Sequence, residues 1–350
     1  MNDSELTEQL ESFIEFVRRK LDGKSMAGLD VWAARFGELR QSGQYELCRQ
    51  LAHAIRTTID PKDHQDVGVV RYAEGWLYDR IGEKRNAIKA YTASLVAFRK
   101  AEIPLDSTIM CQIGSVHQDR GDWEKAGLTY QVAIACARDD HDRGLALNNL
   151  GNLAVQKDNL PTAEEHYRAA RELLRDIDKR NFAAATHGLA IVLLGLEEPQ
   201  QSQDMHAECV HLFQALGDYS GVASAVGGVA NAQRSASHPR EAIHNYEQVL
   251  RIDMNWALDP SIGVQTLTNL ALAHQDLGEF ETALQYLSDA IPGYNDLGDR
   301  RGETSALVNL VLLHQLRGDH AAAEQAAADA RTAAERYGFP DELRRLPPGM

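Results

Sequence analysis

A sequence pattern that recurs about every 40 residues constrains the fold of this chain more than any other feature. In one clear copy the turn residue Gly82 is followed five positions later by Ala87 and nine positions later by Tyr91. The turn residues of the other strong copies are Gly121, Asp158 and Ser237, and those of weaker copies are Gly43, Glu197, Gly278 and Gly318. Self-similarity of this length is typical of stacked-repeat proteins, so we expect a row of like units.

Each unit has the sequence of two helices joined by a short turn. Ile109, Ile113 and Val116 precede the turn at Gly121 with helical spacing, and no strand-like alternation of useful length is present. A small residue seven positions before the turn, such as Gly114, lets the two helices of a unit approach closely. The pattern therefore predicts an all-α chain of helix pairs.

This pattern resembles the tetratricopeptide repeat over roughly residues 28–337, in a long-period subclass. Pins-type adaptors, kinesin light chains and bacterial peptide-sensing regulators are the members that it looks most like. The resemblance implies a right-handed superhelical α-solenoid of about eight helix pairs. The unit that turns at Glu197 departs from the pattern, because Ser202 replaces the alanine and His206 replaces the tyrosine. A bend or a break in register is one interpretation of that unit.

The two ends differ from the repeats. Within residues 1–27, Leu6, Leu10, Phe13, Val17 and Leu21 form an apolar stripe of helical spacing. This helix is interpreted as a cap on the first repeat or, alternatively, as a seam that joins two copies of the chain or a helix on which a partner docks. Residues 338–350, which contain three prolines, are predicted to form a flexible tail.

Composition limits the partners. The formal net charge of −15 disfavours nucleic acids and anionic membranes, and no apolar run is long enough to span a bilayer. The four cysteines lie far apart, and the first residues lack the features of a secretion signal, so a cytoplasmic location is expected. Runs rich in alanine, arginine and aspartate favour a bacterial source.

The resemblance implies that the first helix of each pair lines an inner groove. Asn148 and Asn152 lie one turn apart on the groove side of their helix, with Asn149 beside them. An amide both donates and accepts hydrogen bonds, so a row of amides suits the main chain of a bound peptide. The predicted peptide- or protein-binding residues are Tyr72, Trp76, Arg80, Gln118, Asn148, Asn149, Asn152, Asn231, Arg234 and Gln275.

Several of these assignments have structural alternatives. Asn149, like the equivalent Asn269 and Asn309, either contacts a ligand or bonds to the neighbouring helix. Tyr72 and Trp76 either form an aromatic wall in the groove or belong to the core. Arg80 and Arg234 either bind a carboxylate or remain solvated.

No enzymatic motif is present, and neither a cofactor nor a metal is expected. His117, His274 and His314 lie at one repeat position in three different units, which favours a structural role. The run "DDHDRG" at 139–144 is interpreted as a linker with a helix-capping aspartate.

These observations favour a non-enzymatic scaffold that binds a protein or peptide segment in its groove. One alternative is a peptide-responsive sensor that switches an effector protein. Another is a structural oligomer that assembles through the N-terminal helix.

Overall fold

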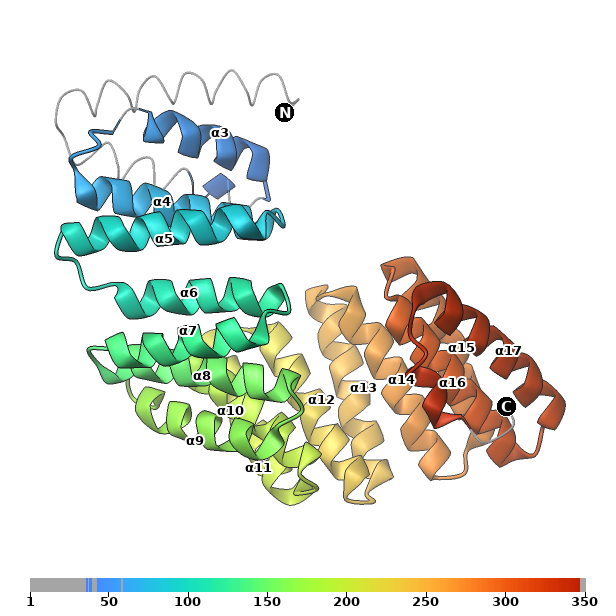
Figure 1. Ribbon diagram of the computed structural model, residues 1–350. Coiled ribbons are helices and arrows are strands. Elements are labelled where there is room, and N and C mark those ends of the chain that lie inside the picture. Colours follow the sequence, from blue (N-terminus) through green and yellow to red (C-terminus); the bar gives the residue numbers. More distant parts are fainter. Residues whose placement is uncertain (1–35, 37, 40–42, 58, 347–350) are drawn as a thin grey trace. The chain divides into compact units, whose positions relative to one another are not determined.

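The computed structural model describes residues 36, 38–39, 43–57 and 59–346. The predicted helix in residues 1–27 lies outside this part of the chain. The described residues form α-helices and one short 3-10 helix, with no strand among them (Figure 1). The all-α prediction is therefore confirmed, and no described helix is long and apolar enough to cross a membrane.

The helices alternate between the two positions of a repeat. The first helices of the pairs are α4 (His64–Arg80), α6 (Asp106–Asp119), α8 (Asp140–Gln156), α10 (Lys179–Gly195), α12 (Tyr219–Ser235), α14 (Pro260–Asp276) and α16 (Arg300–Arg317). The second helices are α3 (Tyr45–Arg56), α5 (Lys84–Lys100), α7 (Trp123–Cys136), α9 (Leu160–Leu174), α11 (Pro199–Leu216), α13 (Pro239–Trp256), α15 (Phe280–Leu297) and α17 (His320–Tyr337). The 3-10 helix η1 (Glu342–Arg345) follows α17.

The chain divides into two compact units. The first contains residues 1–159 and 172–177, and the second contains residues 160–171 and 178–350. Within each unit, helices that follow one another in sequence pack against one another, as α4 does on α5 and α14 on α15. Helix packing between sequence neighbours is the arrangement that a repeat array requires.

A left-handed backbone conformation marks the turn of every repeat. The φ angle is positive at all eight turn residues, and ranges from 57° at Asp158 to 81° at Gly82 and Gly318. This conformation favours glycine, which explains why glycine recurs at the turn. The turn positions predicted from the sequence are confirmed.

Aspartate starts most of the first helices. The carboxylate of Asp139 accepts a hydrogen bond from the backbone nitrogen of Asp142 at 2.8 Å, which confirms the predicted capping aspartate. The interpretation of the run 139–144 as a linker is wrong, because α8 already begins at Asp140. Equivalent caps begin α4, α10, α12, α14 and α16 at Asp63, Asp178, Asp218, Asp259 and Asp299. These caps satisfy backbone donors that a helix cannot pair internally.

Aromatic rings pack directly on glycines. A Cβ atom added to Gly114 would lie 2.4 Å from the ring of Tyr130, and one added to Gly75 would lie 2.6 Å from Tyr91. In the divergent unit His206 fills the aromatic position and is 1% exposed, while the Ser202 hydroxyl donates to the Ala190 carbonyl at 2.8 Å. The pair α10–α11 therefore keeps the repeat geometry, and the sequence-based interpretation of a bend or register break there is wrong.

The chain after α17 differs from its predicted form. Residues 338–350 are expected to be a flexible tail, whereas the structure places η1 against α16 and α17. The contacts that hold it come from residues about 40 positions earlier in the chain, so local sequence does not reveal them.

Candidate functional site

A polar groove crosses the first helices of the second unit. One cavity of about 280 Å³ is bordered by α10, α12 and α14, and its lining includes His187, Ser224, Asn231, Gln265 and Asn269. A second cavity of about 570 Å³ is bordered by α14, α16 and η1. Gln265 and Asn269 line both cavities, and the two cavities together are called the polar groove below.

The lining follows the repeat register. Ser224, Gly227, Asn231, Gln265, Thr268 and Leu272 occupy the positions thirteen, ten and six before their turns, where the resemblance implies a groove. The larger cavity also includes Ser305 and Asn309, which are the counterparts on α16 of Gln265 and Asn269. Helices α14 and α16 therefore present polar side chains at the same two repeat positions.

Gln265 and Asn269 are available for a ligand. The two residues lie one turn apart on α14, and neither side chain makes a hydrogen bond within the part of the chain that the structure describes. The opposite side of α14 is apolar, with Leu270, Ala271 and Ala273 buried. Packing of that apolar side directs the polar side of the helix to the groove.

The predicted residues of the second unit have different surroundings. Asn231 lines the smaller cavity, and its carbonyl oxygen accepts a hydrogen bond from the Tyr246 hydroxyl at 2.6 Å. Arg234 forms an ion pair with Asp276 at 3.2 Å, so its guanidinium is not solvated alone. Its binding to a ligand carboxylate stays a prediction. Gln275 is half-buried near the end of α14, outside the residues that line the two cavities.

The aromatic residues of the first unit pack inside it. Trp76 contacts Tyr45, with ring centroids 6.2 Å apart, and the Arg80 guanidinium lies 5.5 Å from the centre of the Trp76 ring. Tyr72 meets Tyr91 edge-on, with centroids 5.4 Å apart. These contacts agree with the packing alternative for Tyr72 and Trp76, and they occupy one face of the Trp76 ring with a cation.

The amides of the first unit are divided between packing and exposure. Asn149 bonds to the Cys111 thiol on α6, which corresponds to the neighbouring-helix alternative. The Gln118 side-chain oxygen accepts from the Tyr130 hydroxyl at 2.9 Å. Asn152 is exposed, whereas the side-chain oxygen of Asn148 is buried without a hydrogen-bond partner in the described chain. The contact of Asn148 and Asn152 with a ligand stays a prediction, since neither residue lines either cavity.

Two sets of side chains are of types that can be reactive or bind a metal. They are the Cys111 thiol and the cluster of Asp139, His141 and Asp142. Burial raises the pKa of the Cys111 thiol to about 11, so the thiol remains protonated at neutral pH and is a poor nucleophile. Asp139, His141 and Asp142 have ligand atoms within 4.8 Å of one another. The Asp139 carboxylate already caps α8, and Asp142 accepts from the Thr108 hydroxyl at 3.5 Å. These contacts give both carboxylates a structural role.

The α16 side of the groove was missing from the predicted site. Arg301, Ser305 and Asn309 lie at intervals of four residues on this helix and line the larger cavity. The regular spacing of the turns provides the signal for Ser305 and Asn309, because they are thirteen and nine positions before Gly318. No sequence signal identifies Arg345, which lines the same cavity from η1.

Models described as tetratricopeptide repeat match residues 72–141, 181–255 and 264–336, more than half of the chain. No curated protein matches the sequence.

Solved structures agree in fold. The apo form of RapI has a TM-score of 0.67 at 10% identity, over 91% of this chain and 94% of that one. A tetratricopeptide repeat protein from Parabacteroides merdae has a TM-score of 0.56 at 12% identity, over 80% and 98% of the two chains.

A larger protein also shares the fold. The signal transduction ATPase with numerous domains from Pyrococcus horikoshii, which has a tetratricopeptide repeat sensor, gives a TM-score of 0.62 at 14% identity. The match covers 86% of this chain but only 48% of that protein. Tetratricopeptide repeats generally serve as scaffolds for protein interaction, and the chain belongs to the tetratricopeptide repeat family.

Proposed function

We propose that this chain is a non-catalytic scaffold and that its polar groove holds an extended segment of a partner protein. The observation that carries the proposal is the pair Gln265 and Asn269, which line both cavities with no side-chain hydrogen bond among the described residues. Two amides one turn apart present donors and acceptors to a peptide main chain, largely irrespective of its side chains.

The rest of the groove suits the same ligand. Asn231 adds an amide nitrogen, Ser224 adds a hydroxyl, and Leu272 adds an apolar contact along the same row of helices. The net charge of −15 favours a neutral or basic partner over an acidic one. We further propose a cytoplasmic setting, because all four cysteines are free and three of them are buried.

Site-specific photo-crosslinking tests the groove. A benzophenone amino acid at Leu272, within the groove, is compared with one at Gln214, an exposed position on α11. The full-length proteins are irradiated in lysate of the source cells, and mass spectrometry identifies the attached segments. We expect one partner segment to attach at position 272 and not at position 214.

The double variant Gln265→Ala/Asn269→Ala distinguishes specific binding in the groove from nonspecific binding to the protein surface. In the Leu272-labelled protein it is expected to reduce the crosslinked product at least tenfold, because two main-chain contacts are lost. The variant Gln214→Ala is the matched control and is expected to leave the product unchanged. A partner that attaches equally well in all three proteins would place the binding surface outside the groove.

A further inference from the structure

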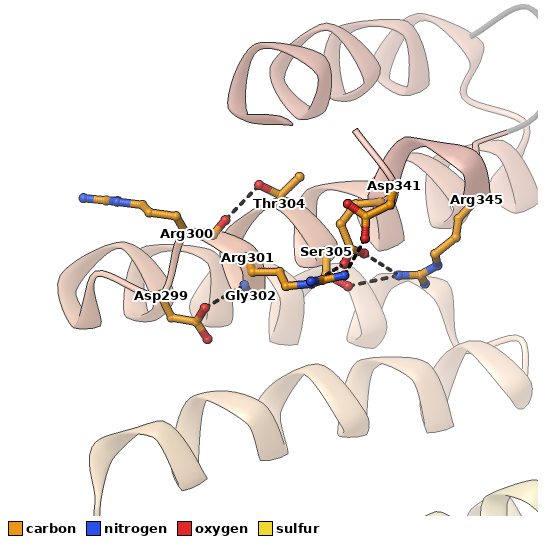
Figure 2. A network of polar contacts seen from close by, with 9 residues as sticks. Asp299, Arg300, Arg301, Gly302, Thr304, Ser305, Asp341 and Arg345 are labelled. Carbon is orange, nitrogen blue, oxygen red and sulfur yellow. Dashed lines mark hydrogen bonds and ion pairs between the residues drawn. The ribbon is translucent and has the colours of Figure 1, made fainter. Parts of the chain in front are cut away.

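The chain already places one of its own segments in the polar groove. The Arg345 guanidinium donates to the Ser305 hydroxyl at 3.0 Å (Figure 2). It also donates to the side-chain oxygen of Asn309. Ser305 and Asn309 are the α16 counterparts of Gln265 and Asn269, which carry the proposed function. On α16 an arginine side chain thus binds Ser305 and Asn309. The counterparts of these two residues on α14 make no side-chain hydrogen bond within the described residues.

A second contact orients this segment. The Arg301 guanidinium pairs with Asp341 at 2.5 Å and with Glu342 at 2.9 Å, and it lies 5.7 Å from the ring centre of Phe339. Arg301 is one turn before Ser305 on the same face of α16. The helix therefore presents a cation followed by two hydrogen-bond acceptors, and the segment presents carboxylates followed by a guanidinium.

The contacts are selective within the segment. The side chain of Arg344, next to Arg345, is exposed and makes no hydrogen bond or ion pair with any residue that the structure describes. Asn309, by contrast, is only 4% exposed and the Glu342 side chain only 12%. The Arg345 side chain is itself 43% exposed, but its guanidinium bonds to the nearly buried Asn309, whereas Arg344 makes no such bond. Arg345 rather than Arg344 therefore carries the recognition.

The larger cavity contains two equivalent sets of residues, which we call the α14 subsite and the α16 subsite. Ser261, Gln265 and Asn269 on α14 hold the repeat positions that Arg301, Ser305 and Asn309 hold on α16, and all six line this cavity. The α16 subsite is filled by the chain itself, while the side chains of Gln265 and Asn269 have no hydrogen bond within the described residues.

We propose that the segment Asp341–Arg345 is a resident ligand of the chain's own groove. Resting on the proposed function, the inference is that the partner segment has the same chemistry, a carboxylate followed three or four residues later by arginine. Such a segment replaces the resident one, pairing its carboxylate with Arg301 and its guanidinium with Ser305 and Asn309. Because the resident segment is tethered, its effective concentration is in the millimolar range and lowers the apparent affinity for the partner.

A peptide in trans tests the competition. The probe is fluorescein-labelled GFPDELRRL, the sequence of residues 338–346, and fluorescence anisotropy is followed as full-length protein is added. The variant Arg345→Ala weakens the resident segment, so we expect it to bind the probe at least tenfold more tightly than the unchanged chain does. Arg344→Ala is the matched control and is expected to bind like the unchanged chain.

The contact between arginine and Asn309 is tested by one change in the probe and one change in the protein. Replacing the second arginine of the probe by alanine is expected to weaken binding to the Arg345→Ala protein at least tenfold. Replacing Asn309 by alanine in that protein is expected to have a similar effect. Equal binding by the unchanged chain and by Arg345→Ala, or no binding by either, overturns the inference.

Proteolysis of the full-length chain provides a measurement without added ligand. A protease cleaves a locally opened, extended chain, so we expect trypsin to cleave after Arg344 and Arg345 when the segment leaves α16. Arg301→Ala is expected to raise the rate of this cleavage several-fold, because the pairs with Asp341 and Glu342 are lost. An unchanged rate contradicts the resident position. If these tests fail while crosslinks at Leu272 persist, the proposed function stands and the resident-ligand inference alone is wrong.

Discussion

Single residues in the turns differ in conformational strain. The turn residues Asp158, Glu197 and Ser237 adopt the same left-handed backbone as the glycines of the other repeats. A side chain in this conformation brings its Cβ close to the backbone, which costs roughly 1–2 kcal/mol per residue. Apart from the adjoining residues, an added Cβ at Gly121 meets nothing within 4 Å, so no other part of the described chain crowds this turn. The turns at glycine and the turns at Asp158, Glu197 and Ser237 therefore differ in the strain of the backbone at the turn residue.

Exchange of turn residues is expected to move the stability in opposite directions. Glu197→Gly is expected to raise the free energy of unfolding by about 0.5–1 kcal/mol, because the relief of strain exceeds the added flexibility of the unfolded chain. Gly121→Ala is expected to lower it by about 1 kcal/mol. Urea unfolding followed by circular dichroism measures both changes. A stabilising effect of Gly121→Ala would contradict the assigned conformation.

A second residue-scale prediction concerns acid. Burial lowers the pKa of His206 to about 3, and burial also lowers the pKa of the adjacent His187. His206 is therefore neutral in the folded protein, whereas in the unfolded chain it takes up a proton below a pKa near 6.5. The unfolded state binds more protons between these two values, so the free energy of unfolding falls as the pH drops from about 6.5 towards 3.

The expected loss at pH 5 is about 2 kcal/mol for His206. The variant His206→Tyr is expected to remove this part of the pH dependence, and it is sterically reasonable because Tyr167 packs on Gly188 at the corresponding site one repeat earlier. Unfolding is measured in urea at pH 7 and pH 5 for both proteins. An equal loss in the two would place the titrating group elsewhere.

Helix packing within a unit depends on which side of a helix a glycine faces. Gly227 and Gly228 are neighbours on α12, yet an added Cβ would lie 3.9 Å from Val249 at Gly227 and 2.3 Å from the His206 ring at Gly228. The close approach of α11 to α12 therefore requires glycine at position 228, whereas position 227 has room for a Cβ atom.

The two glycines provide a matched pair of variants. Gly228→Ala is expected to destabilise the protein by roughly 1–3 kcal/mol, because the His206 ring must move. Gly227→Ala is expected to be neutral or to stabilise by up to about 1 kcal/mol, since alanine is the better helix former. Differential scanning calorimetry distinguishes the two. Similar melting temperatures for both variants would contradict the close α11–α12 contact.

At the scale of the whole molecule, the described helices of each unit pack against helices near them in sequence. In such arrays stability is roughly a sum of local terms, so damage remains local. In native-state hydrogen exchange, Gly228→Ala is expected to reduce protection in α10–α13 and to leave α4–α6 of the first unit unchanged. A uniform loss of protection along the chain would indicate one cooperative body instead.

The sequence predicts the helices and turns well because their determinants lie within one repeat. The tyrosine nine positions after a turn, for example Tyr130, finds its glycine inside the same helix pair. Local spacing also identifies Gln265 as a groove residue. The pairing of Arg234 with Asp276 and of Arg345 with Asn309 joins residues about 40 positions apart. Such contacts depend on the relative placement of successive repeats, which no local pattern describes.

Arg301 has no charged counterpart on α14, and this difference affects the direction in which a bound segment lies. The α14 and α16 faces match at two positions, Gln265 with Ser305 and Asn269 with Asn309, but Ser261 stands where α16 has Arg301. Two matching faces alone would accept a partner segment in either orientation. The single guanidinium attracts the acidic end of a segment, so a ligand with the resident chemistry enters with one polarity, from carboxylate to arginine along α16.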